Sequence, residues 1–306
     1  MILKEIKRFL SFVEIQTKLA TIFPFLVALA YVFYTTGTIN IISTALYIVA
    51  ALIVDMAITA TNQHFDKREE KGETPHYSNL VSISIIIIMY TIAAVLGLYL
   101  ASIHGLVVFL AGVFCFMIGI MYTFGPIPIS KSVYGEIAAG FVAGFLIMFI
   151  VVSINNPLFM PVVAVFNQYN FNFTLNIDII GLLSFGLVTL PAVFSSANIL
   201  LANNICDAKK DRAYRYTLTH HIGNKKALML FAALYYASYL AIVVAVILQI
   251  IPAWSLLTLI TFVPVQKNIS KFFKQQIKDI TFVLSVRNYS IILFVFALSI
   301  TIDGFI

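Results

Sequence analysis

Two segments of this sequence repeat one pattern of amide and carboxylate side chains. In each segment an asparagine is followed by acidic residues four and eight positions later. The two sets are Asn62, Asp66 and Glu70, and Asn203, Asp207 and Asp211. Because a step of four residues advances about 40° beyond a full helical turn, each set lies along one face of a helix. The repeated spacing predicts two matching polar helix ends.

Carboxylate and amide oxygens suit a hard divalent cation. Proteins bind Mg²⁺ through one or two carboxylates and complete its coordination with water and substrate phosphates. Two polar helix ends that face each other would form a split site with a phosphate group between them. One acidic pair at this spacing is usually a solvated surface, but two matched copies favour a site. We therefore predict Mg²⁺ binding by both sets, with Asp66, Asp207 and Asp211 as the catalytic carboxylates.

Further side chains are candidates for contact with a phosphorylated substrate. They are Lys18, Asp55, Tyr122, Lys131 and Asn203. Asp55 lies within an apolar stretch, where an acid is costly and is often functional. It contacts either the substrate or metal-bound water, or it bonds to a neighbouring helix. Lys18 either contacts phosphate or extends to the membrane interface, whereas Lys131 is expected to bind phosphate. Tyr122 either hydrogen-bonds the substrate or is an ordinary interfacial tyrosine.

The composition is that of an integral membrane protein. Hydrophobic residues make up 61% of the 306 residues, and only 10% are charged, against about 25% in soluble domains. The mean hydropathy is +1.00. The net charge of +6 is better explained by membrane topology than by nucleic acid, which we do not expect as a partner. The two cysteines do not indicate a disulfide framework.

Nine apolar stretches are candidate membrane spans, since about 20 apolar residues cross a bilayer. They are Ala20–Thr36, Ile41–Ala60, Leu80–Ile103, Gly105–Phe124, Val133–Ile154, Ile179–Ala202, Ala227–Ile250, Ala253–Val265 and Tyr289–Asp303. The eighth stretch is short. With the N-terminus in the cytoplasm and all nine spans threaded, all 19 Lys and Arg residues fall in cytoplasmic segments. This distribution follows the positive-inside rule and supports the eighth span.

These features predict one all-α, multi-pass domain over residues 1–306 in the cell membrane, surrounded by lipid. The two acidic sets follow the second and sixth spans, so both lie at the cytoplasmic face. Secondary transporters place their polar sites near the middle of the bilayer. A transporter is therefore the less favoured alternative class, with only Asp55 at depth.

The sequence resembles the UbiA family of membrane prenyltransferases. Members have nine transmembrane helices, an N-D-x-x-D-x-x-x-D motif after the second helix and a D-x-x-x-D motif after the sixth. The stretch from Asn203 to Arg212 and the following Thr217–Gly223 (TLTHHIG) match the second motif and its continuation. In the first motif Gln63 replaces the usual aspartate, and Glu70, or its neighbour Glu69, replaces the last one.

The resemblance implies Mg²⁺-dependent transfer of a prenyl group from a polyprenyl diphosphate to an aromatic acceptor. The stretch Tyr122–Glu136 (YTFGPIPISKSVYGE) is similar to the 1,4-dihydroxy-2-naphthoate polyprenyltransferases of menaquinone synthesis. That acceptor is therefore expected, with demethylmenaquinone as the product. Other acceptors of the family, 4-hydroxybenzoate, haem or a chlorophyll precursor, remain alternatives.

Overall fold

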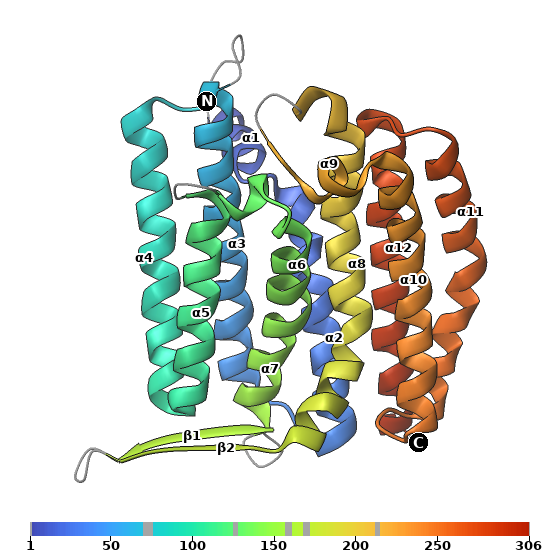
Figure 1. The fold of residues 1–306 in the computed structure, drawn as a ribbon. Coiled ribbons are helices and arrows are strands. Elements are labelled where there is room, and N and C mark those ends of the chain that lie inside the picture. The colour runs from blue at the N-terminus through green and yellow to red at the C-terminus, as the bar shows by residue number, and fades with distance from the viewer. Residues whose placement is uncertain are drawn as a thin grey trace.

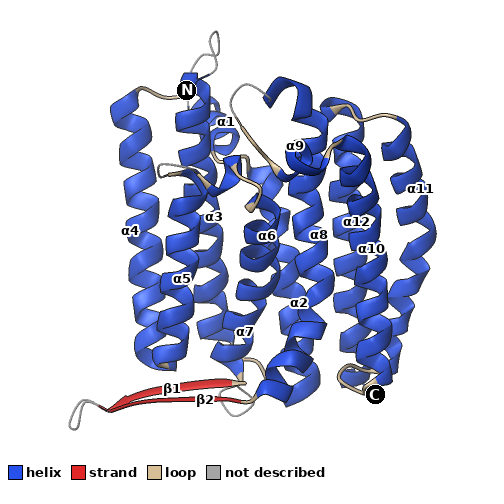
Figure 2. Ribbon diagram, in the orientation of Figure 1, coloured by secondary structure: helices blue, strands red, loops and turns tan. Residues whose placement is uncertain are grey.

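The computed structural model is a bundle of long, nearly parallel helices with one β-hairpin at one end (Figures 1 and 2). It describes residues 2–69, 76–124, 128–156, 161–167, 172–211 and 215–305. The amino-terminal half contains α1 (Ile2–Phe12), α2 (Leu19–Thr36), α3 (Ile41–Glu69), α4 (Asn79–His104), α5 (Leu106–Thr123), α6 (Gly135–Ala139) and α7 (Ile147–Asn155). The remainder contains β1 (Val162–Asn167), β2 (Asn172–Ile177), α8 (Ile179–Asp211), α9 (Leu218–Ile222), α10 (Asn224–Ile247), α11 (Phe262–Lys274) and α12 (Lys278–Thr301).

Within the described residues, eight helices are long and apolar enough to cross a membrane. They agree with eight of the nine expected spans. The predicted span Ala253–Val265 lies in a 3-10 helix, Ala253–Thr261, that continues directly into α11. Figure 1 shows α11 standing beside α10 and α12. A ninth crossing remains a prediction, as does the orientation of the bundle.

The last helix differs from the predicted one. It was expected to begin at Tyr289 but begins at Lys278. Arg287 interrupts the apolar run in the sequence, yet it is exposed, whereas Leu284 and Asn288 are buried. One face of α12 is therefore continuous with the core for the whole helix, while the charge lies on another face. Average hydropathy hides such a one-sided helix.

The β-hairpin is a departure from the all-α class. It occupies the connection before α8, where β1 pairs with β2 in antiparallel register, with Val162 opposite Ile177 and Asn167 opposite Asn172. Figure 2 shows the hairpin lying across the end of the bundle. The run Val162–Phe166 is apolar throughout, so it lacks the polar–apolar alternation from which a strand with one wet face is recognised. We call this end of the molecule the hairpin end.

Close packing of two helices depends on a glycine in the turns between α6 and α7. Residues 140–146 form π-helical turns there. A Cβ added to Gly144 would lie 2.4 Å from the backbone of Val193 in α8. Only glycine allows this approach, as at small-residue contacts in membrane helix bundles. The contact fixes α8 against the middle of the bundle.

The exterior of the bundle is apolar along its helices. On α4, for example, Leu80, Ile87, Val95 and Leu98 are each more than half exposed. A soluble monomer seldom exposes a continuous apolar band of this kind. The surface therefore agrees with a position in lipid. The core lies largely between α2, α7, α8, α10 and α12, where Tyr289 donates a hydrogen bond to the backbone oxygen of Ala20 (2.7 Å).

Candidate active site

The two predicted acidic sets lie at the same end of the bundle. Both α3 and α8 run away from the hairpin end and finish at the opposite end, which we call the motif end (Figure 1). The last turns of α3 carry Asn62 and Asp66, and those of α8 carry Asn203, Asp207 and Asp211. The structure describes the backbone, but not the side chains, of Asp66 and Asp211.

Glu70, the third member of the first set, lies outside the described residues. Glu69, the alternative third acid, is the last residue of α3, and its side chain is not described. Both helix ends therefore lie at the same end of the bundle, whereas their facing each other across one site stays a prediction. The coordinating set of carboxylates stays a prediction.

Asp207 is held by a cation from another helix. Its Oδ2 atom pairs with the ammonium group of Lys278, the first residue of α12. The Asp207 side chain is 14% exposed and that of Lys278 is 50% exposed. A half-exposed ammonium group beside a largely covered carboxylate supplies the positive charge that the carboxylate requires. A dissolved cation could replace this ammonium group, because Lys278 is already half in solvent.

The amide groups of both sets are accessible at the motif end. Asn62 and Asn203 are each half-buried. Within the part of the chain that the structure describes, neither side chain makes a hydrogen bond. By contrast, the next residue on α3, Gln63, donates its amide to the carboxylate of Glu14. Glu14 follows α1 in a left-handed backbone conformation, with φ 47° and ψ 60°.

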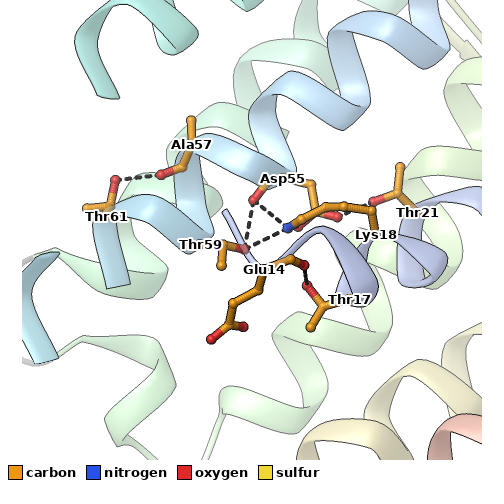
Figure 3. A network of polar contacts seen from close by, with 8 residues as sticks. All are labelled: Glu14, Thr17, Lys18, Thr21, Asp55, Ala57, Thr59 and Thr61. Carbon is orange, nitrogen blue, oxygen red and sulfur yellow. Dashed lines mark hydrogen bonds and ion pairs between the residues drawn. The ribbon is translucent and has the colours of Figure 1, made fainter. Parts of the chain in front are cut away.

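A buried ion pair lies two turns below Asn62 and joins two segments of the chain (Figure 3). The Lys18 ammonium donates to Asp55 Oδ1 (2.7 Å), to the Asp55 backbone oxygen (3.1 Å) and to Thr59 Oγ1 (2.7 Å). Thr21 Oγ1 donates to the other carboxylate oxygen of Asp55 (2.6 Å). Lysine has three N–H donors, so all of them are engaged.

This network bears on two predicted substrate contacts. Lys18 is only 2% exposed, and its three donors are engaged within the protein, so its side chain does not extend to the membrane interface here; phosphate contact stays a prediction. Lys18 joins the start of the first span to α3. Asp55 shows the neighbouring-helix bond that was one of its two expected roles, and its side chain remains 27% exposed. These contacts favour positioning of α3 as the role of the pair.

Tyr122 lies in the last turn of α5 and Lys131 lies shortly before α6; both are half-buried. The backbone oxygen of Lys131 accepts a hydrogen bond from the Tyr216 amide (3.1 Å). This bond joins the loop before α6 to the segment before α9. The structure thus places the Lys131 segment beside the chain that follows the second acidic set. Contact of either side chain with phosphate remains a prediction.

The start of α9 holds the end of α8. His220 Nε2 donates to the backbone oxygen of Ala208 (2.8 Å), the residue after Asp207. Nδ1 then accepts from the Thr217 amide (3.3 Å), which completes a capping box at α9. His220 is therefore part of the scaffold that holds the second acidic set, whereas the neighbouring His221 is exposed.

The donors at the motif end fit a hard divalent cation. They are amide and carboxylate oxygens on two helix ends, and the one carboxylate whose side chain is described already attracts an ammonium ion. Among the described side chains, no group of three or more His, Cys, Asp or Glu residues could hold a metal. That finding leaves the pairing of the two sets open, because Asp66 and Asp211 are not among those side chains.

Three contacts of the motif end were not predicted from the sequence. These contacts are made by Lys278, Glu14 and Thr59. Each is brought to its partner by the packing of helices, and no local spacing indicates it. One sequence feature could have indicated the Glu14 contact. Gln63 occupies a motif position where an acid is usual, and an amide at that position can donate a hydrogen bond to a carboxylate from another segment.

A family model described as "UbiA prenyltransferase family" matches residues 21–284. Among curated proteins, the chain is 30% identical over 166 residues to the 1,4-dihydroxy-2-naphthoate octaprenyltransferase of Bacillus subtilis (strain 168). That match covers 54% of this chain and 46% of the relative. The match thus spans about half the length of both proteins.

Solved structures share the fold over almost the whole chain. A structure of digeranylgeranylglyceryl phosphate synthase has a TM-score of 0.64 at 13% identity, with 98% of this chain and 99% of that one covered. A UbiA homologue from Archaeoglobus fulgidus bound to GPP and Mg²⁺ has a TM-score of 0.65 at 14% identity, covering 98% and 100%. The same homologue bound to DMAPP and Mg²⁺ has a TM-score of 0.62 at 13% identity, covering 95% and 99%.

Proposed function

Because the chain belongs to the UbiA prenyltransferase family, we propose that it transfers a polyprenyl group from a polyprenyl diphosphate to an aromatic acceptor. The acceptor that we propose is 1,4-dihydroxy-2-naphthoate, which would give the reduced, hydroquinone form of demethylmenaquinone. Mg²⁺ is the proposed cofactor, since solved structures of a UbiA homologue contain Mg²⁺ together with GPP or DMAPP.

One observation carries the proposal. The Asn-x-x-x-Asp pairs of α3 and α8 lie on helix ends at the same end of an apolar bundle. A lipid-soluble donor with a charged diphosphate needs this arrangement, because its tail requires an apolar environment and its head requires cations at the membrane surface. The helices are correspondingly apolar along their length and polar at the motif end.

Each residue of the site has a proposed task. Asn62, Asp66, Asn203, Asp207 and Asp211 would hold Mg²⁺, with Glu70 or Glu69 completing the first set. Mg²⁺, when bound, neutralises charge on the departing diphosphate. Lys131, from the segment before α6, and Tyr122, from the last turn of α5, would contact the diphosphate or acceptor. The Lys18–Asp55 pair would hold α3 in place, and substrate contact by either residue would be made from that position. Lys278 pairs with Asp207 and adds a cation beside the leaving group.

The bond changes follow from the substrates. The C1–O bond of the allylic diphosphate breaks, and the diphosphate leaves with the electron pair. The electron-rich ring forms the new C–C bond and then loses a proton or its carboxyl group as it regains aromaticity. Preorganised charges around the leaving group are the largest expected contribution to rate.

The choice of acceptor rests on two supports. They are the name of the Bacillus subtilis relative and the resemblance of Tyr122–Glu136 to the enzymes of menaquinone synthesis. Fold similarity does not separate acceptors, because a synthase named for a glyceryl phosphate product shares the fold equally well. 4-Hydroxybenzoate, haem and a chlorophyll precursor therefore remain alternative acceptors.

We further propose nine transmembrane spans, with the motif end in the cytoplasm. The support is the distribution of Lys and Arg along the sequence. In this orientation the hairpin end faces outward.

The test is incubation of the purified protein with Mg²⁺, one polyprenyl diphosphate and a panel of acceptors, with products read by mass. The proposal expects a product from 1,4-dihydroxy-2-naphthoate that has gained the prenyl group and lost carbon dioxide. If only another acceptor gave a product, the proposed acceptor would be wrong and the proposed prenyl transfer would stand. Absence of any prenylated product across the panel would contradict the proposed function.

A further inference from the structure

Two polar side chains meet in the interior between α6 and α8. The Asn204 amide nitrogen donates to Glu136 Oε1 at 2.9 Å. Glu136 is 3% exposed and Asn204 is 1% exposed. Within the part of the chain that the structure describes, no cation pairs with Glu136. An ionised carboxylate in such a place would carry the cost of losing water without compensation from a positive charge.

The second oxygen of the Glu136 carboxyl group and the oxygen of the Asn204 amide indicate the protonation state of Glu136. Glu136 Oε2 and Asn204 Oδ1 are both buried and both lack a hydrogen-bond partner. Each is an acceptor when the acid is ionised, so neither can satisfy the other. A single proton on Oε2 turns it into a donor, and Asn204 Oδ1 is the acceptor on the group already bonded to it. One proton therefore accounts for both unsatisfied atoms.

We propose that Glu136 is a neutral carboxylic acid that forms a two-hydrogen-bond pair with Asn204 and so positions the second acidic set. Asn204 lies between Asn203 and Asp207 on α8. Neighbouring residues on a helix point about 100° apart. A pair that fixes Asn204 against α6 therefore also fixes the rotation of α8, and with it the face of the helix on which Asn203 lies, half-buried.

Other contacts of α8 lie within one turn of the Glu136–Asn204 pair. A Cβ added to Gly135, the residue before Glu136, would lie 3.2 Å from Leu200 Cδ2 on α8. The two helices are thus in close contact one turn before Asn204. Three turns of α8 are tied to other segments: Leu200 packs on α6, Asn204 bonds Glu136, and Ala208 bonds His220. Of these three contacts, only the Glu136–Asn204 pair uses an α8 side chain that adjoins a proposed metal ligand, Asn203.

The role in metal binding rests on the proposed function, whereas the protonation of Glu136 does not. The first measurement is therefore independent of activity. Infrared spectra of the wild type at neutral pH should contain the carbonyl band of a protonated carboxylic acid. The band should be missing from Glu136→Gln and present in the control Glu5→Gln, which changes an exposed acid on α1. Identical spectra for the wild type and Glu136→Gln would overturn the proposal.

The second measurement separates positioning from charge. Glutamine reproduces the neutral acid, because its amide both donates to and accepts from Asn204, so Glu136→Gln should need nearly the wild-type Mg²⁺ concentration for half-maximal rate. Glu136→Ala leaves Asn204 unpaired, and it should raise that concentration by about tenfold while the protein still folds. A loss in Glu136→Gln as large as that in Glu136→Ala would show that the carboxylate charge is required and would overturn the proposal.

Discussion

Replacing Lys18 by methionine should destabilise the protein far more than its position at a helix start suggests. Lys18 is 2% exposed, and its ammonium group makes three contacts, two of them with Asp55. Methionine keeps the length and apolar stem of the side chain but leaves the Asp55 carboxylate without its cation. Breaking a buried ion pair by removing one partner costs about 3–5 kcal/mol. Because the Asp55 side chain is 27% exposed, we expect about 3 kcal/mol, the lower end of that range.

The assay is reversible unfolding of the purified protein in mixed micelles, with Asp55→Asn and the double variant measured beside Lys18→Met. The two residues contact each other directly, so the double variant should cost less than the sum of the single variants by about 1–3 kcal/mol. Lys225→Met is the matched control, because Lys225 is exposed on α10, and it should change stability by less than about 0.5 kcal/mol. A Lys18→Met protein as stable as this control, or single effects that simply add, would refute the ion-pair account.

Further predictions concern metal, topology and packing. Prenyl transfer should stop in EDTA and return with Mg²⁺, and full turnover in metal-free protein would contradict the role of the carboxylates. In a cysteine-free background, a cysteine at Lys274 should label only from the cytoplasmic side and one at Asn176 only from outside; outside labelling at Lys274 would remove the span Ala253–Val265. Gly144→Ala should destabilise by about 1–3 kcal/mol through overpacking against α8, as measured by the same unfolding assay. Gly112→Ala, whose added Cβ would meet no atom within 4 Å, should not.

The sequence was sufficient to place the helices that carry the site. The repeated spacing of asparagine and acid predicted two polar helix ends, and α3 and α8 end together at the motif end. A step of four residues keeps each set along one face of a helix, and the long apolar run before each set indicates a membrane-spanning helix rather than a strand. Family membership follows from the same residues and from the match over residues 21–284.

Contacts between helices could not be predicted from the sequence. Lys18 and Asp55 were each recognised as unusual, but they are 37 residues apart, and nothing local indicates that one neutralises the other. Lys278 reaches Asp207 across 71 residues for the same reason. The hairpin was missed because Val162–Phe166 of β1 shows no alternation, although β2 (NFTLNI) alternates polar and apolar residues. The start of α12 was missed because Arg287 lies on the exposed face of the helix.

The measurement that tests the central claim most directly is a double-mutant cycle between the two helix ends. Asp66→Asn and Asp207→Asn should each lower the rate of prenyl transfer roughly 10²–10³-fold, since each removes charge that stabilises the leaving group. Asp303→Asn, an exposed acid at the hairpin end, should leave the rate unchanged. If α3 and α8 share one Mg²⁺ and one diphosphate, the double variant will lose much less than the product of the two single losses. Losses that multiply in full, or a folded Asp207→Asn protein with wild-type rate at low Mg²⁺, would contradict the shared site.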